Sequence, residues 1–363
     1  MLASALLLAI ATVEPPAQPG LPSPPAPRAA DEVADLVAAG RYVDAISALE
    51  AAVAAHPEDT TLLVRLGVLY ARTRRPEAEA TFKRVLERDA RDPHALPNID
   101  ALVDLGSLEL REKRYREAVE HLDAARARGA HGVALFIRLG VAHESLAELE
   151  AAREAYAAAV DEGAGPEALL PLGRLLIKLG RHQEAEVVLL KAVAARPRGP
   201  VLWLELGRAR DKLGRGDEAE AAYQKSIEYD GAAPEPHYAL GTLLVRRGQT
   251  DAGQAELRRF KELSDARDAT DHLSGQIATL NRAGLKLLAD GRTLDAIETF
   301  EQAIALGPAN GAVHANLGGA LLSVGNARGA LVALEEAIKR GGDVDAFRAL
   351  LARAKQAAAP SSR

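Results

Sequence analysis

The sequence predicts an all-α protein built as a solenoid, in which short helical repeats stack side by side. A pair of Leu and Gly recurs along the chain, most often at an interval of 34 residues. These pairs are Leu66-Gly67, Leu105-Gly106, Leu139-Gly140, Leu172-Gly173, Leu206-Gly207, Leu240-Gly241 and Leu317-Gly318, with Ala283-Gly284 in the same place once. A fixed period of this length is typical of helical repeat proteins. We therefore look for function on an extended surface.

A second helix is predicted in each repeat from residues that follow the glycine. A small residue comes twelve positions after it at Ala118, Ala152, Ala185, Ala219, Ala296 and Ala330, with Ala78 one residue early and Gly253 in the same place once. Four residues later comes a large apolar side chain: Phe82, Leu122, Tyr156, Leu189, Tyr223, Leu257, Phe300 or Leu334. Residues four apart share one helix face, so the small residues can let two antiparallel helices approach closely.

The turn between the two helices is predicted at a further glycine, seven residues after the first. It is present at Gly180, Gly214, Gly248, Gly291 and Gly325. Glycine adopts the left-handed conformation that ends many helices at little cost, so these residues are expected to be helix C-caps.

Two repeat intervals are longer than the others. One of 39 residues contains Pro93 and Pro97, and proline disfavours helix both at its own position and at the residue before it, so we expect a loop over 90–97. The other, of 43 residues, holds a polar insertion at 265–276. We expect this insertion to extend a helix and then turn, which makes it a candidate hinge.

Nine repeats and a terminal helix account for most of the chain. The first repeat is found by counting 34 residues back from Gly67 to Val33, and the spacing of Phe347, Leu350 and Leu351 predicts a capping helix, which solenoids need. The predicted segments are a candidate signal peptide at 1–13, a Pro-rich linker at 14–30, repeats 1 to 7 at 31–264, the insertion at 265–276, repeats 8 and 9 at 277–342, and the capping helix and tail at 343–363.

These residues resemble the tetratricopeptide repeat (TPR) family, whose 34-residue pattern places Leu-Gly, Ala, aromatic and Pro residues at fixed offsets. Two repeats follow the pattern closely, one with Trp203, Leu206, Gly207, Ala219 and Tyr223, the other with Gly291, Ala296, Phe300, Ala303 and Pro308. The resemblance implies a right-handed α-solenoid, or superhelix, of helix-turn-helix repeats. It also implies that the first helix of each repeat lines a concave groove.

The N-terminus carries features of an export signal. An apolar run from Leu2 to Ile10 ends in small residues suited to cleavage after Ala11, and seven prolines follow between residues 14 and 30. The run is too short to span a bilayer, and the prolines predict an extended linker. No Lys or Arg precedes the run, however, so a cytoplasmic protein with a frayed tail is the alternative to a periplasmic or secreted one.

Composition excludes several kinds of chemistry. The chain has no cysteine, which rules out disulfides, thiolate metal sites and cysteine nucleophiles, and its net charge of -6 gives no general attraction to nucleic acid. His143 and His182 lack the second histidine of a helical zinc site, and no P-loop, nucleophile elbow or dinucleotide fingerprint is present. We expect no enzyme activity, no cofactor and no metal.

Groove residues follow from the resemblance, which assigns positions 2, 5, 9, 12 and 13 of each first helix to ligand contact when the repeat glycine is position 8. These positions hold a predicted basic strip of Arg174, Lys178, Arg208, Lys212 and Arg246. They also hold Tyr238, Asn281 and the aliphatic residues Val64, Val103, Ile137, Val141, Leu170 and Leu204, and Asn316 lies on a first helix as well. A cation at position 13 has an alternative role, since it also stabilises the negative end of a helix dipole.

The sequence thus predicts a non-catalytic TPR scaffold that binds a partner protein or extended peptide, which the basic strip suggests is acidic, in its concave groove. We expect a monomer or weak oligomer without a membrane span, located in the bacterial cell envelope. One alternative is an assembly or oligomerisation factor acting through convex or terminal surfaces. Another is a cytoplasmic TPR adaptor.

If the protein is exported, its N-terminal segment should be removed in the native host. Signal-peptidase cleavage after Ala11 would leave Thr12 as the first residue. Mass spectrometry of the mature N-terminus checks this expectation, and an intact Met1 would contradict it.

Overall fold

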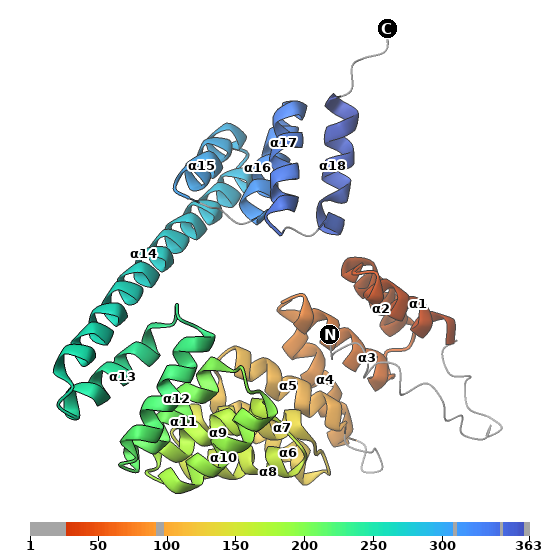
Figure 1. Cartoon of the computed structure of the whole chain (residues 1–363). Helices are drawn as coiled ribbons and strands as arrows, with labels where there is room; N and C mark the ends of the chain where they lie inside the picture. Colours follow the sequence, from red (N-terminus) through yellow and green to blue (C-terminus); the bar gives the residue numbers. More distant parts are fainter. Residues whose placement is uncertain (1–26, 92–97, 308–310, 342–343, 359–363) are drawn as a thin grey trace. The chain divides into compact units, whose positions relative to one another are not determined.

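The computed structural model describes residues 27–91, 98–307, 311–341 and 344–358, and every regular element within them is an α-helix (Figure 1). In chain order the helices are α1 (Pro27–Ala38), α2 (Tyr42–Ala55), α3 (Thr60–Arg72), α4 (Glu77–Arg91), α5 (Ile99–Arg111), α6 (Tyr115–Ala127), α7 (Val133–Ser145), α8 (Leu149–Asp161), α9 (Pro166–Lys178), α10 (His182–Ala195), α11 (Pro200–Lys212), α12 (Gly216–Tyr229), α13 (Pro234–Arg246), α14 (Thr250–Ala289), α15 (Thr293–Ala305), α16 (Gly311–Ser323), α17 (Ala327–Lys339) and α18 (Val344–Ala358). The predicted all-α repeat architecture is confirmed.

Each repeat glycine lies where a side chain of the second helix presses against the first. A Cβ atom added to Gly140 would lie 2.5 Å from the ring of Tyr156, and one added to Gly207 would lie 2.5 Å from the ring of Tyr223. Both tyrosines are 1% exposed. The Leu-Gly period therefore records the positions where two helix backbones must approach closely.

The turns between paired helices use the left-handed conformation. The five predicted glycines have φ values of 75°, 77°, 80°, 75° and 81° in chain order, which confirms their role at helix ends. Where a repeat lacks the glycine, Arg74, Lys113 and Ala147 adopt positive φ in its place. The turn geometry is thus kept even where the residue is unfavourable for it.

Helix starts follow from the local sequence. Proline opens α9, α11 and α13, where its missing N–H removes no helical hydrogen bond. The Asp59 side chain accepts from the N–H of Thr61 at 2.9 Å at the start of α3, and Asn98 accepts from the N–H of Ala101 at 3.0 Å at the start of α5.

The region of the second insertion differs from the prediction. Figure 1 shows α14 as one uninterrupted helix of 40 residues, which joins the second helix of repeat 7 to the first helix of repeat 8. The turn expected within 265–276 is wrong, because this polar segment contains no proline and its single Gly275 sits in open space without interrupting the helix. The candidate hinge is therefore a helical segment.

Smaller differences occur at two other predicted boundaries. The sequence predicts a Pro-rich linker over 14–30, but α1 already begins at Pro27. Residues 90 and 91, expected to belong to a loop over 90–97, are helical, because α4 continues through Arg91. Residues 1–26, with the candidate signal peptide, and 92–97 lie outside the described part of the chain.

The helices form two compact units that divide between Pro197 and Arg198. Unit 1 contains α1 to α10, and its largest fully buried side chains include Phe82, Leu105 and Leu139. Unit 2 contains α11 to α18. At its end, Phe347, Leu350 and Leu351 of α18 pack against the core that holds Phe300 and Leu334, as expected of a capping helix.

Two glycine substitutions are expected to change stability in opposite directions. Gly140→Ala should lower the free energy of unfolding by about 1–3 kcal/mol, because the new methyl group overlaps the Tyr156 ring. Gly275→Ala should raise it by about 0.5–1 kcal/mol, because alanine favours helix and the position is open. Urea unfolding followed by circular dichroism measures both, and equal effects would contradict the packing argument.

Candidate functional site

Unit 1 carries a line of aliphatic side chains along its first helices, which we call the first-helix row. It consists of Val64 and Val68 on α3, Val103 on α5, Ile137 and Val141 on α7, and Leu170 on α9. Four of them occupy position 5 of successive repeats, and all four are half-buried. Val68 and Val141 at position 9 are 38% and 42% exposed. The row therefore offers apolar contact area to a ligand.

Cations flank this row. Arg138 lies next to Ile137 on α7, is half-buried, and makes no ion pair or hydrogen bond with any residue that the structure describes. Arg65 occupies the equivalent position on α3 and is exposed, as is Lys178 near the end of α9. A half-buried guanidinium without a protein partner retains its hydrogen-bonding capacity for a ligand.

Asp104 is the acidic member of the same region. It sits on α5 at the position equivalent to Arg65 and Arg138. Burial raises its pKa to about 6, while Arg138 and Arg111 act in the opposite direction and Asp100 adds to the increase. The Arg111 guanidinium also donates to the carbonyl oxygen of Ala71 on the preceding first helix at 3.1 Å.

The predicted basic strip is divided between the units. Arg174 and Lys178 lie on α9 in unit 1, and both are exposed. Arg208, Lys212 and Arg246 lie on α11 and α13 in unit 2, where acidic residues pair with two of the three.

Two ion pairs account for that neutralisation. Arg208 donates to Glu205 at 3.0 Å, and the Glu205 side chain is only 3% exposed. Arg246 pairs with Asp211 of the preceding first helix. The cation at position 13 in this repeat therefore links neighbouring repeats, and of the three residues Lys212 is the one with no ion pair in the described structure.

The other predicted groove residues also contact neighbours. Tyr238 on α13 is 51% exposed and its ring lies 5.1 Å from that of Phe260 on α14. Asn316 Nδ2 on α16 donates to Asn281 Oδ1 on α14 at 2.9 Å. The structure thus brings the two asparagines together and leaves the Tyr238 ring open on one side.

Buried charges elsewhere in unit 1 form a structural network. Burial raises the pKa of Glu109, although its contact with His121, 2.8 Å from Nδ1 to Oε2, opposes that rise. Arg114 donates to both carboxylate oxygens of Glu79, at 3.1 Å and 2.9 Å. These groups pair with one another between α4, α5 and the start of α6.

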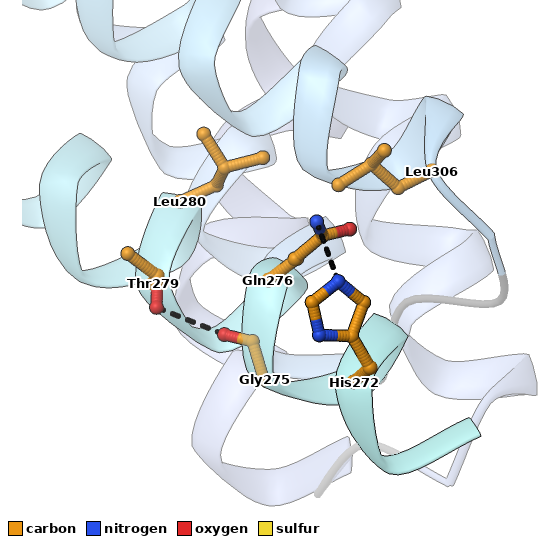
Figure 2. A pocket seen from close by; sticks show the side chains of 6 residues that line it. All are labelled: His272, Gly275, Gln276, Thr279, Leu280 and Leu306. Carbon is orange, nitrogen blue, oxygen red and sulfur yellow. Dashed lines mark hydrogen bonds between the residues drawn. The ribbon is translucent and has the colours of Figure 1, made fainter. Parts of the chain in front are cut away.

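A hollow of about 610 Å³ lies on unit 2, and Figure 2 shows the side chains that line it. Its lining residues are His272, Gly275, Gln276, Thr279 and Leu280 of α14, with Leu306 just after α15. Their polar atoms are directed at one another: Gln276 Nε2 lies 3.1 Å from His272 Nε2, and Thr279 Oγ1 donates to the Gly275 carbonyl at 2.9 Å. The hollow is open and lacks a converging set of catalytic groups.

Within the described residues, no group of three or more His, Asp or Glu side chains is placed to hold a metal ion. Likewise, none of the helices described is both long and apolar enough to cross a bilayer.

The paired helices, close glycine contacts and long first-helix surface define a helical-repeat scaffold for protein interaction. Two family models described as tetratricopeptide repeat match the chain, one at residues 36–96 and 287–354, the other at 103–168 and 170–236. The chain belongs to the tetratricopeptide repeat family, as the sequence pattern predicts. This family is typically non-catalytic. The stretch between the third and fourth matches in chain order, 237–286, holds most of α13 and α14.

Similar solved structures include helical repeat proteins of bacteria. MamA 41-end from Desulfovibrio magneticus RS-1 is 21% identical, with a TM-score of 0.45, and the match covers 48% of this chain and 99% of that one. A tetratricopeptide repeat protein from Parabacteroides merdae is 15% identical, also with a TM-score of 0.45, and the match covers 82% of this chain and 98% of that one. A comparison of the sequence with curated proteins gives no significant match.

Sequence reasoning missed Arg138 and Asp104. Both lie at position 6, which the family rule for groove positions does not include. The available signal was a charged residue at the same position in three successive repeats: Arg65, Asp104 and Arg138. Residues at the same position of successive repeats lie side by side on a solenoid, so a charge repeated at one position indicates a shared surface.

Asp104→Asn is expected to stabilise the protein at neutral pH. The pKa of the Asp104 carboxyl is about 6 in the folded state and 3.8 for a freely exposed aspartate, so the folded state binds more protons between these values and stability falls as pH rises through them. The Asn variant should unfold with a free energy about 1–3 kcal/mol higher at pH 7, and the difference should vanish near pH 4. Urea titrations between pH 4 and 7 measure it. A difference that grows toward low pH would contradict the burial argument, and the exposed Asp265→Asn serves as control.

Proposed function

We propose that the first-helix row of unit 1 binds an acidic segment with aliphatic side chains on a partner protein. The observation that carries the proposal is the regular line of aliphatic residues on four successive first helices beside an unpaired, half-buried Arg138. Scaffold activity in the tetratricopeptide repeat family acts through such surfaces.

Apolar contacts supply the first part of the recognition. Val68 and Val141 expose apolar area, and the half-buried Val64 and Ile137 lie one helical turn away from them on the same helices. A partner with aliphatic side chains at a matching repeat would remove this area from water, which stabilises the complex by about 25 cal/mol per Å² buried before the costs of association.

Charge supplies the second part. Arg65, Arg138 and Lys178 outnumber Asp104 along the row, so an acidic partner is favoured over a basic one. A guanidinium can hold a carboxylate with two parallel hydrogen bonds, and hydrogen bonds to charged groups contribute about 1.5–3 kcal/mol each. The predicted acidic partner therefore remains our proposal, with Arg138 taking the central role in place of Arg208 and Arg246.

We place this scaffold in the cell envelope, a proposal supported by the apolar run and Pro-rich segment of the N-terminal sequence. A cytoplasmic adaptor would use the same row. An assembly factor would instead act through the exposed apolar residues of second helices, such as Val187 and Val332 at 55% and 67% exposure.

Variants of the row should lose partner capture. The double variant Val68→Glu with Val141→Glu should reduce recovery of a specific partner at least about tenfold, because it places acidic groups on the apolar contact surface facing an acidic ligand. Arg138→Glu should have a similar effect. Affinity capture from the native organism, quantified by mass spectrometry, measures recovery relative to wild type.

Matched controls place the same substitution on second helices. Val43→Glu with Val187→Glu changes two residues that are 67% and 55% exposed, and recovery should stay at the wild-type level. Loss of capture in this control alone would point to the assembly-factor alternative. Equal recovery with all variants would refute a role for the row.

A further inference from the structure

The end of repeat 7 in unit 2 presents a helix face that the rest of the described unit leaves uncovered. In other repeats, the second helix carries a large residue four positions after its small residue, and this large residue is fully buried. Phe82, Leu122, Tyr156, Tyr223, Phe300 and Leu334 are each 0% or 1% exposed. Leu257, the equivalent residue on α14, is only half-buried. Three residues before it, Gln254 is exposed, whereas Val119, Arg153, Glu220, Ile297 and Leu331 at the equivalent position are half-buried.

The second helix of repeat 7 is not packed against the first helix of repeat 8. In a regular solenoid that helix turns back and packs on the preceding second helix, but α14 continues straight through residue 289. Repeat 9, by contrast, is covered by α18, whose Ala354 is 0% exposed against the core that contains Leu334. Repeat 7 therefore lacks the capping helix that ends the other stack of unit 2.

Residues on both sides explain why repeat 8 does not provide the cover. Phe260 replaces the small buried residue found at Ala125, Ala159, Ser226, Ala303 and Ala337, so a helix cannot approach as closely. On the first helix of repeat 8, Ala283 and Lys286 are exposed where Leu240 and Leu243 of repeat 7 are buried. Lys286 would also bring a positive charge toward Arg258 and Lys261.

The chemistry of the uncovered face indicates its occupant. A shallow hollow of about 310 Å³ is lined by Gln254, Leu257, Arg258 and Lys261. Both cations are exposed and have no ion pair with other described residues. Beside them, the Phe260 ring packs against the exposed Tyr238 ring, with centroids 5.1 Å apart and planes tilted by 55°. Leu257 and Phe260 thus form an apolar area that Arg258 and Lys261 border with positive charge.

We propose that this face, formed by Gln254, Leu257, Arg258, Phe260 and Lys261, binds an amphipathic helix of a partner protein whose apolar side is flanked by acidic residues. The partner helix caps repeat 7 as α18 caps repeat 9. Its acidic residues pair with Arg258 and Lys261. The first helix of repeat 8 could not form these pairs, because it carries the basic Lys286 at the contact position. This site is separate from the first-helix row and does not depend on it.

Two labelled peptides test the proposal on the full chain. One has the sequence of α18 (Val344–Ala358), which already has the apolar spacing of a capping helix. The other has the same sequence with its basic residues replaced by glutamate. Fluorescence anisotropy should show that the acidic peptide binds at least about tenfold more tightly than the native one, as charge complementarity requires.

Charge reversal on the protein provides the decisive comparison. Arg258→Glu with Lys261→Glu should remove the preference for the acidic peptide or reverse it. The matched control, Arg116→Glu with Lys191→Glu, changes exposed, unpaired cations on α6 and α10 and should preserve the preference. Circular dichroism verifies that both double variants keep wild-type helicity.

Other outcomes overturn the proposal. No binding of the acidic peptide, or binding that the Arg258 and Lys261 changes leave unaltered, shows that the face is not the site. Binding abolished by Val68→Glu with Val141→Glu but not by the α14 variant assigns the peptide to the first-helix row instead. A dimer in light scattering that the α14 variant disperses would make a second copy of this chain the occupant.

Discussion

The close approach of a glycine on one helix to a large side chain on its partner is the constraint on which the architecture depends. A Cβ atom at Gly67, Gly173 or Gly284 would lie 2.5–2.7 Å from the facing side chain, which leaves no room for any other residue without movement. Each contact fixes one helix pair, and the pairs stack because the next first helix seals the same large residue. The repeated surface along the first helices is a consequence of this packing.

Helix pairing could be predicted from the sequence because the constraint has a signature in residue type. Gly, Ala and a large apolar residue are forced by packing, and the left-handed turns at Gly180 and Gly291 follow from backbone sterics. The uninterrupted α14 could not be predicted by the same reasoning. A repeat spacing of 43 residues is met equally by a turn or by extra helix, and only the absence of proline and the open position of Gly275 favour the helix.

The sequence predicts which helices carry the candidate site, but it does not predict which charged side chains there are left without an ion pair. Position along the first helices follows from the repeat, and Val64, Ile137 and Leu170 lie at equivalent positions of α3, α7 and α9. Whether a cation there is free depends on neighbours from other helices, as the Arg246 pair with Asp211 shows. Arg138 forms no ion pair with a described residue. It is close enough to Asp104 to lower the pKa of that carboxyl, but the two side chains do not form an ion pair.

The same packing rule explains where a stack ends. Stacking needs a small residue on the second helix and apolar residues on the helix that follows; Phe260 violates the first requirement and Lys286 the second. Neither substitution harms α14 itself, because both side chains are good enough helix formers on its surface. A solenoid can thus be interrupted by changing only residues that face the next repeat, and the interruption leaves an apolar face that regular stacking would bury. Leu257 and Phe260 remain partly exposed on that face, so a helix bound there would remove their apolar area from water, as the next repeat does elsewhere.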